Sequence, residues 1–392
     1  MKRDSAIELF RILLIFGICL LHVGVVSWFS SALVSCVPGF VLISGYFGIR
    51  FSWRKILKLY LVAMYASLVI PLVGGCWSLS SYFLEALRVW NIRLDSVQPS
   101  GFWFLHAYAI MSVLTIPVEM VLEGELTREK AQRLWRISLP VLIAVFGWGF
   151  LTKFNALAPF VPTVNGLQGF SPITLFASYL AGRNLMVWEN FNGKVPRKLS
   201  AACFVGSLVL LCFFRSYLAG YNSFVSVVLA VSAFLLFREI RVPERFAKIV
   251  LAVSPSMFSV YLIHVHMYWA GMEHSYMVFG REILKALSPH LGSVLAVGVT
   301  SLVVFGCALL LDLPRRIVGW GVREWRSWQE LREGSWRLEK SGSSLWLCMT
   351  ATGRMPNMSL TWRRILRSWR LMQRGLSRLI SMAGFAPSCW GM

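Results

Sequence analysis

The sequence alternates long apolar stretches with short clusters of basic residues, and this alternation limits what the chain can fold into. The apolar stretches are about 20 residues long, which is the length that an α-helix needs to cross a bilayer. Overall, 57% of the residues are apolar and 15% are charged, whereas a soluble domain carries about 25% charged residues. The pattern excludes intrinsic disorder, collagen and a coiled coil. It predicts an all-α integral membrane protein that crosses the bilayer several times.

Ten apolar runs are candidates for membrane-spanning helices, so the predicted fold is a bundle of about ten transmembrane helices over residues 1–314. The first run follows Lys2 and Arg3, as a secretory signal peptide would. It is too long for a signal peptide and contains Arg11, so a retained helix is favoured. The ten runs are 9–29, 33–49, 59–76, 102–122, 137–154, 170–188, 201–218, 222–237, 254–271 and 293–313.

The basic residues predict the orientation of this bundle. A net charge of +21 could indicate a nucleic-acid partner, but the basic residues gather between the apolar runs. With the N-terminus in the cytoplasm, 17 lysines and arginines outside the tail fall on cytoplasmic segments and 6 fall on the other side. This asymmetry follows the positive-inside rule and would invert if one span were miscounted. We therefore expect both termini in the cytoplasm, membrane lipids around the bundle, and no nucleic-acid partner.

The eight cysteines give no sign of a metal site or a disulfide framework. Six of them lie in or at the edge of apolar runs, and two lie in the tail. No Cys-x-x-Cys pair and no cluster of cysteine with histidine occurs in the sequence. We expect buried, reduced cysteines that pack as small apolar residues, and no bound metal.

The first apolar run carries the polar residues that are most informative about chemistry. Glu8, Arg11 and His22 are costly inside a membrane and are therefore candidates for function. Arg11 and His22 are separated by close to three helical turns, so both project from one face about 16 Å apart along the axis. Glu8 can pair with Arg11 on that face. The sequence places Arg11 near the cytoplasmic boundary and His22 near mid-membrane. The alternative is an interfacial ion pair and a hydrogen-bonded core histidine.

Further polar residues in later runs could face the same cavity. His106 follows Trp103 in the fourth run, where it could instead be a helix-end residue beside an interfacial aromatic belt. Tyr261 and His264 are three residues apart and share a helical face. A hydrogen bond inside the bundle explains that pair as well as catalysis does.

The second run combines small residues with a basic segment that follows it. Ser44 and Tyr46 lie beside glycines, which permit close helix contact or close approach of a ligand. Arg54, Lys55 and Lys58 come directly afterwards. Such a cluster can bind phosphates, although the positive-inside rule alone would also explain it.

Four landmarks along residues 1–313 together resemble the membrane-bound acyltransferase family 3. The first is the series Glu8, Arg11 and His22. These proteins begin with an acidic residue, a basic residue three positions later, and then a histidine after ten intervening positions. The second is the Phe/Leu-rich run that ends in Ser-Gly-Tyr-Phe and a basic loop, from Phe40 to Lys58. The other two are the segments 101–104, with its Trp-Phe pair, and 261–264, with its Tyr-Leu-x-His series.

The resemblance implies an enzyme of the cell inner (cytoplasmic) membrane that transfers an acyl group, commonly acetyl, from cytoplasmic acyl-CoA. The implied acceptor is a hydroxyl of a cell-surface polysaccharide or of a lipid-linked saccharide. His22 matches the catalytic histidine, Glu8 its acidic partner in the motif, and Arg11 the donor-site base, with Arg54, Lys55 and Lys58 as further donor-site candidates. The residues expected to contact the acceptor substrate are Ser44, Tyr46, Trp103, His106, Tyr261 and His264.

Two mechanisms and a second function stay open at the level of sequence. His22 can act as a general base on the acceptor hydroxyl, or it can carry the acyl group itself as a nucleophile. The alternative function is an exporter of glycans or lipid-linked saccharides in which Arg11 and His22 line the path and no chemistry occurs. A purely structural membrane protein would leave the polar face of the first run unexplained.

The composition changes in residues 315–392, which we expect to form a basic cytoplasmic tail. This segment holds 14 of the 39 basic residues and 8 of the 17 tryptophans, and it departs from the family pattern after about residue 320. Apolar residues recur with helical spacing over 361–381, with arginines on the other faces, which predicts an amphipathic helix on the membrane surface. We expect residues 321–360 to be poorly ordered. A disordered tail or a non-native extension is the alternative.

Overall fold

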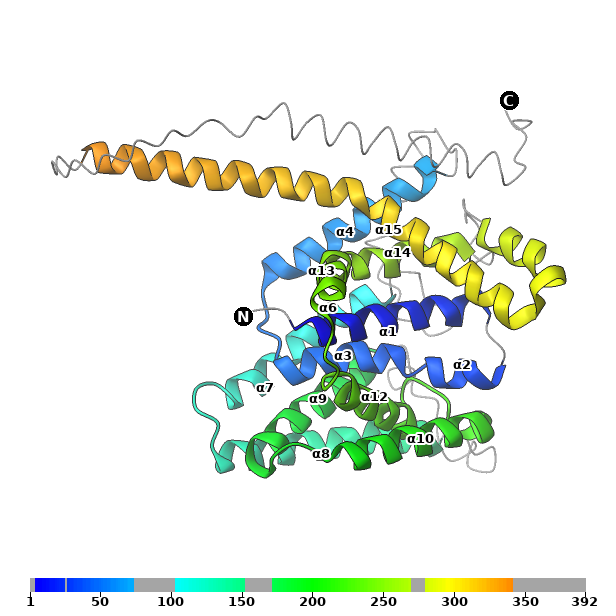
Figure 1. Ribbon diagram of the computed structural model, residues 1–392. Coiled ribbons are helices and arrows are strands. Elements are labelled where there is room, and N and C mark those ends of the chain that lie inside the picture. Colours follow the sequence, from blue (N-terminus) through cyan, green and yellow to red (C-terminus); the bar gives the residue numbers. More distant parts are fainter. Residues whose placement is uncertain (1–3, 25–26, 74–102, 152–170, 269–278, 341–392) are drawn as a thin grey trace. The chain divides into compact units, whose positions relative to one another are not determined.

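A computed structural model describes residues 4–24, 27–73, 103–151, 171–268 and 279–340, and every regular element in these ranges is a helix (Figure 1). The chain divides into two compact units, Met1–Asp312 and Leu313–Met392. The helices are α1 (Ser5–Val23), α2 (Ser27–Leu33), α3 (Cys36–Phe47), α4 (Trp53–Val73), α6 (Trp103–Leu114), α7 (Ile116–Val121), α8 (Arg128–Leu151), α9 (Pro172–Asn192), α10 (Arg197–Phe213), α11 (Arg215–Leu218), α12 (Phe224–Phe237), α13 (Glu244–Val253), a 3₁₀ turn (Ser254–Ser256), α14 (Met257–Tyr268) and α15 (Phe279–Lys340).

The all-helical membrane fold predicted from the sequence is confirmed. Among the described residues, five helical stretches are long and apolar enough to cross a bilayer, and each overlaps one of the expected runs. They are Ser5–Val23, Phe29–Phe47, Trp103–Val121, Glu244–His264 and Ile283–Gly319. The other five runs fall wholly or partly on α4, α8, α9, α10 and α12. A total of ten spans, with both termini in the cytoplasm, stays a prediction.

The first apolar run is not one helix over 9–29, as the sequence suggested. α1 begins at Ser5, where the Asp4 side chain accepts a hydrogen bond of 2.8 Å from the Ala6 amide. It ends at Val23 because Gly24 adopts the left-handed conformation (φ 98°) that terminates helices. His22 therefore lies in the last turn of α1 and not in the middle of a longer helix.

α3 and α9 pack with their backbones almost in contact because each contributes a glycine to the crossing. A Cβ atom added at Gly45 would lie 2.1 Å from the carbonyl oxygen of Tyr179, and one added at Gly182 would lie 2.3 Å from that of Leu42. No side chain larger than hydrogen fits at either position. Small residues at helix crossings are the usual means of close packing in membrane bundles.

Two ion pairs that the sequence analysis did not single out fasten α9 to its neighbours. Arg183 on α9 donates two hydrogen bonds of 2.8 Å to Glu119 on α7. Glu189, near the end of α9, pairs with Arg238 after α12 and accepts a bond of 2.9 Å from Tyr46 on α3. Burial alone would raise the pKa of the Glu189 carboxyl, but the bonds from Arg238 and Tyr46 outweigh it and hold that pKa below its ordinary value.

α15 continues to Lys340, so residues 321–340 are helical where the sequence predicted a poorly ordered segment. This stretch is rich in arginine and glutamate, which favour helix, and it contains no proline. The amphipathic helix expected over 361–381 lies outside the described residues.

We predict that Gly45→Ala destabilises the bundle, because the new methyl group must displace the Tyr179 carbonyl. Overpacking of this kind costs about 1–3 kcal/mol. The matched control is Gly206→Ala on α10, where an added Cβ meets nothing within 4 Å. Thermal unfolding of the detergent-purified protein, monitored by size-exclusion chromatography of heated samples, should show a lower unfolding midpoint temperature for Gly45→Ala only. Equal midpoints for the two variants would contradict the close crossing.

Candidate active site

Two histidines from opposite ends of the bundle sequence meet where α1 packs against α14. The Nδ1 atom of His22 lies 2.8 Å from the Nε2 atom of His264, which is hydrogen-bond distance. His264 is almost fully buried, with 1% of its surface exposed, whereas His22 is partly exposed. His264 reaches back along its own helix, and its Nδ1 atom lies 3.0 Å from the carbonyl oxygen of Val260.

The ion pair predicted on α1 is present at the other end of the same helix. Arg11 donates a hydrogen bond of 3.0 Å to Glu8, whose side chain is 9% exposed against 32% for Arg11. Tyr108 on α6 hydrogen-bonds to Ser44 on α3 and lies within electrostatic range of Arg11. The hydrogen bond between Ser44 and Tyr108 thus joins α3 to α6 within electrostatic range of Arg11.

The three basic residues expected at the donor end lie at the start of α4. Arg54, Lys55 and Lys58 are all exposed in its first two turns. The start of a helix carries a partial positive charge, which adds to that of the three cations and makes this end of α4 electropositive. This segment is therefore suited to bind phosphate groups.

Aromatic side chains occupy the space between the two ends of the site. The ring of Phe104 packs on Phe40 (6.1 Å between centroids) and on Tyr261 (5.3 Å). These three residues, with Ile15 and Ile18 on α1, enclose a void of about 10 Å³. Because Ile15 and Ile18 lie between Arg11 and His22 on α1, the void lies on the way from one end of the site to the other.

The remaining expected residues lie in three different environments. Trp103 packs on Tyr221, with 5.9 Å between centroids, and Tyr261 packs on His264 at the same separation. His106 instead lies 3.0 Å from the hydroxyl of Tyr60 on α4, and its Nε2 atom is buried without a hydrogen-bond partner.

Tyr46 is tied into the structural ion pair of Glu189 and Arg238. Ser44 has a different partner, the hydroxyl of Tyr108.

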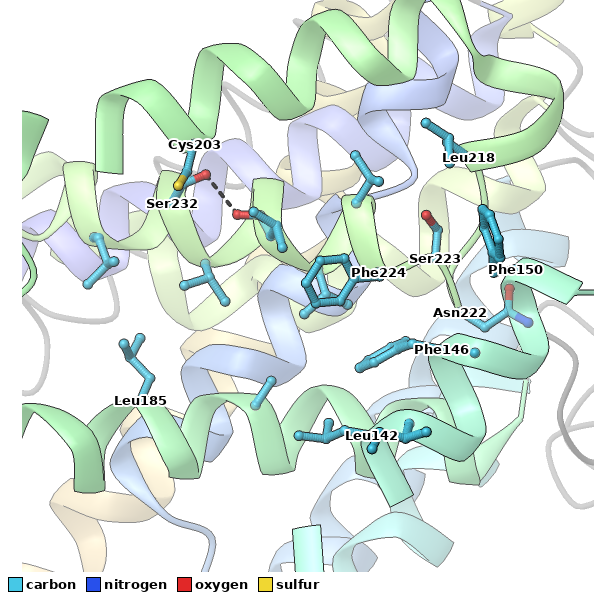
Figure 2. A pocket seen from close by; sticks show the side chains of 18 of the residues that line it. Leu142, Phe146, Phe150, Leu185, Cys203, Leu218, Asn222, Ser223, Phe224 and Ser232 are labelled. Atoms are coloured by element: carbon cyan, nitrogen blue, oxygen red, sulfur yellow. Dashed lines mark hydrogen bonds between the residues drawn. The ribbon is translucent and has the colours of Figure 1, made fainter. Parts of the chain in front are cut away.

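A large apolar cavity lies elsewhere in the bundle (Figure 2). It has a volume of about 760 Å³ and is bounded by α8, α9, α10 and α12, with Phe146, Phe150 and Phe224 around one end. Its lining contains no ionisable side chain apart from Cys203, and no residue of α1 or α14. The cavity therefore offers a hydrocarbon environment and no group for acid–base chemistry.

Sequence reasoning missed Tyr108 and Tyr221, which extend the polar and aromatic parts of the site. Tyr108 is four residues after Phe104 and so shares its face of α6, a spacing that could have drawn attention to it. Tyr221 lies in the short connection between α11 and α12, and nothing in its local sequence marks it.

Comparison with known proteins identifies the family. A sequence profile described as an acyltransferase domain matches residues 4–312, which is the whole helical bundle. No curated protein and no solved structure matches the chain. The polar face of α1, with Glu8 and Arg11 at one end and His22 at the other, lies within the matched region. The chain belongs to the acyltransferase 3 family and is a multi-pass membrane acyltransferase.

Proposed function

We propose that the protein transfers an acyl group, most commonly acetyl, from cytoplasmic acyl-CoA to a hydroxyl of a cell-surface polysaccharide or lipid-linked saccharide. The observation that carries the proposal is the His22–His264 pair, three helical turns along α1 from the Glu8–Arg11 pair. Imidazole is the side chain that most often serves as general base toward a hydroxyl. Membership in an acyltransferase family argues against the alternative of a saccharide exporter without chemistry.

The donor would bind with its phosphates at the cytoplasmic end of α1. Arg11 keeps part of its guanidinium exposed while paired with Glu8, so it can add a phosphate to its contacts. Arg54, Lys55 and Lys58 supply further cations at the start of α4. The thioester arm of CoA, about 15–20 Å long, matches the separation of about 16 Å between Arg11 and His22 along the helix.

The reaction needs one base and one acid, and His22 can serve as both. As general base, it takes the proton of the acceptor hydroxyl while the oxygen forms a bond to the thioester carbonyl. The carbon–sulfur bond then breaks, and the leaving CoA thiolate takes up the proton from His22. In the second route a nitrogen of His22 attacks the thioester carbonyl, the carbon–sulfur bond breaks and CoA leaves as the thiolate. The acceptor oxygen then attacks the acyl-imidazole, the acyl–nitrogen bond breaks, and the hydroxyl proton passes to the CoA thiolate.

Donor binding would have to displace aromatic side chains. The void of about 10 Å³ between the two ends of the site is far too small for the thioester arm. Phe40, Phe104 and Tyr261 would rotate aside when the arm passes between α1 and α6. Their closed arrangement keeps the histidine pair apart from the cytoplasmic end when no donor is bound.

The acceptor would approach from the end of α1 that carries His22. Trp103 and Tyr221 offer packed aromatic rings, and Tyr261 packs on His264, the partner of His22. Aromatic rings with polar edges suit a saccharide, which presents both apolar C–H faces and hydroxyls. We place the site in the cell inner membrane, with both chain termini in the cytoplasm and ten membrane spans.

We predict that His22→Gln lowers acyl transfer by about 10²–10⁴-fold, the usual contribution of a general base. The assay follows [¹⁴C]acetyl transfer from acetyl-CoA to the lipid and glycan fraction of the producing cells, with purified protein in detergent. The matched control is His290→Gln, which removes an exposed histidine of α15. Turnover within a factor of two of wild type in His22→Gln would refute the assignment of His22.

The two routes differ in what happens without an acceptor. Transfer through acyl-His22 predicts that wild-type protein retains one labelled acyl group after mixing with [¹⁴C]acetyl-CoA, and that His22→Gln retains none. General-base catalysis predicts no retained label in either protein.

We predict that Arg11→Gln raises the KM for acetyl-CoA by about tenfold, because a charge-assisted hydrogen bond contributes about 1.5–3 kcal/mol. The kcat at saturating donor should change less, since Arg11 lies far from the reacting atoms. Arg133→Gln is the control, because Arg133 is a similarly basic residue in an exposed pair with Glu129 on α8. An unchanged KM for acetyl-CoA in Arg11→Gln would show that the donor phosphates bind elsewhere.

A further inference from the structure

We propose that His264 is a positioning residue that fixes which ring nitrogen of His22 carries the reactive lone pair. The inference rests on the proposed function, in which His22 is the base or nucleophile. It follows from three atoms on α14 and one on α1, and from the rule that a carbonyl oxygen can only accept a hydrogen bond.

The hydrogen bond to the Val260 carbonyl determines the tautomer of His264. Its Nδ1 atom lies 3.0 Å from the carbonyl oxygen of Val260, one helical turn earlier on α14. Because that oxygen accepts, Nδ1 of His264 must carry a proton. A neutral imidazole holds one N–H proton. The Nε2 atom of neutral His264 therefore presents a lone pair.

The tautomer of His264 in turn determines the tautomer of His22. The Nε2 atom of His264 lies 2.8 Å from Nδ1 of His22. Since Nε2 of His264 accepts in this bond, Nδ1 of His22 donates and carries the single proton of the neutral ring. The lone pair of His22 is then on Nε2, the nitrogen on the far side of its ring from His264.

The ring geometry supports a direct hydrogen bond and argues against face-to-face packing. The two ring planes differ by 17° and the ring centroids are 5.0 Å apart. An imidazole nitrogen lies about 1.1 Å from its ring centre, so rings joined edge to edge by a 2.8 Å bond in a common plane have centres about 5 Å apart. The rings therefore lie side by side, with the N–H of His22 pointing along the lone pair of His264.

This arrangement gives His264 a role other than the substrate contact expected from the sequence. Both of its ring nitrogens are engaged by protein groups, and only 1% of its surface is exposed. His22 is the more exposed of the two. His22 is therefore the histidine that can meet the acceptor hydroxyl, and His264 acts through it.

The same bond stabilises the charge that forms during transfer. When Nε2 of His22 takes the hydroxyl proton, the ring becomes an imidazolium whose Nδ1–H already points at His264. The bond then becomes charge-assisted and stronger. A carboxylate fills this orienting role in serine hydrolases, but a neutral imidazole does so without placing a permanent charge in the bundle.

The test compares two replacements of His264 in the [¹⁴C]acetyl transfer assay. His264→Leu removes the acceptor of the His22 N–H, and should lower kcat by about 10²-fold or more while the KM for acetyl-CoA stays within twofold. His264→Gln can place its amide oxygen where Nε2 was and should recover at least tenfold of that loss. A merely structural role predicts the reverse order, because leucine suits a buried apolar position better than glutamine. His290→Leu is the control for loss of a histidine.

A second measurement uses the unaltered protein and so does not depend on the folding of a variant. Solid-state ¹⁵N spectra are recorded for histidine-labelled protein, and the signals of His22 are those that disappear in His22→Gln. These signals should show a protonated Nδ1 and an unprotonated Nε2. The opposite tautomer, or full activity in His264→Leu, would overturn the inference. If His22→Gln itself remains active, the role that the proposed function gives to His22 fails, and the inference about His264 fails with it; if only His264→Leu remains active, the inference about His264 fails alone.

Discussion

A polar side chain inside a membrane-spanning bundle must find its hydrogen-bond partner within the protein, and the bond between His22 and His264 meets this constraint. The two residues are 242 positions apart in the chain, so the bond exists only when α1 and α14 are packed together. Each histidine alone would be a costly polar group in an apolar setting. Together, and with the Val260 carbonyl, they form a short chain of hydrogen bonds that has a defined direction.

The same constraint separates residues that hold the scaffold from residues that do chemistry. In the Glu119–Arg183 and Glu189–Arg238 pairs, the arginine donates through two nitrogens to both carboxylate oxygens, and these pairs fasten α9 to the helices around it. Arg11, by contrast, is joined to Glu8 by one nitrogen and keeps a third of its side chain exposed. The arginines of the bundle thus differ in whether they bind their carboxylate through two nitrogens or through one, and residue type alone would not distinguish them.

Much of the fold and part of the site could be predicted from the sequence. The length of the apolar runs predicts the helical membrane fold, and helical periodicity predicts that Glu8 lies beside Arg11. Both predictions succeed because they depend only on residues close together in the sequence. The end of α1 at Gly24 was missed, since an apolar run does not reveal where a glycine turns the chain. The bond from His22 to His264 and the two ion pairs of α9 depend on which helices pack together, and no local pattern in one sequence contains that information. For the same reason the hydrogen bonds of Tyr46 with Glu189 and Arg238 could not be predicted.

The central claim is that the acyl group is transferred at His22, at the end of a path that begins at Arg11. An analogue in which a bromomethyl ketone replaces the thioester of acetyl-CoA places an electrophilic carbon where the acyl group would lie. Mass spectrometry of the treated, purified protein would identify the residue whose atom has displaced the bromide. The account predicts alkylation of His22 that excess CoA prevents and that Arg11→Gln slows. Alkylation of another residue while His22 stays unmodified, in a reaction that CoA likewise prevents, would contradict it.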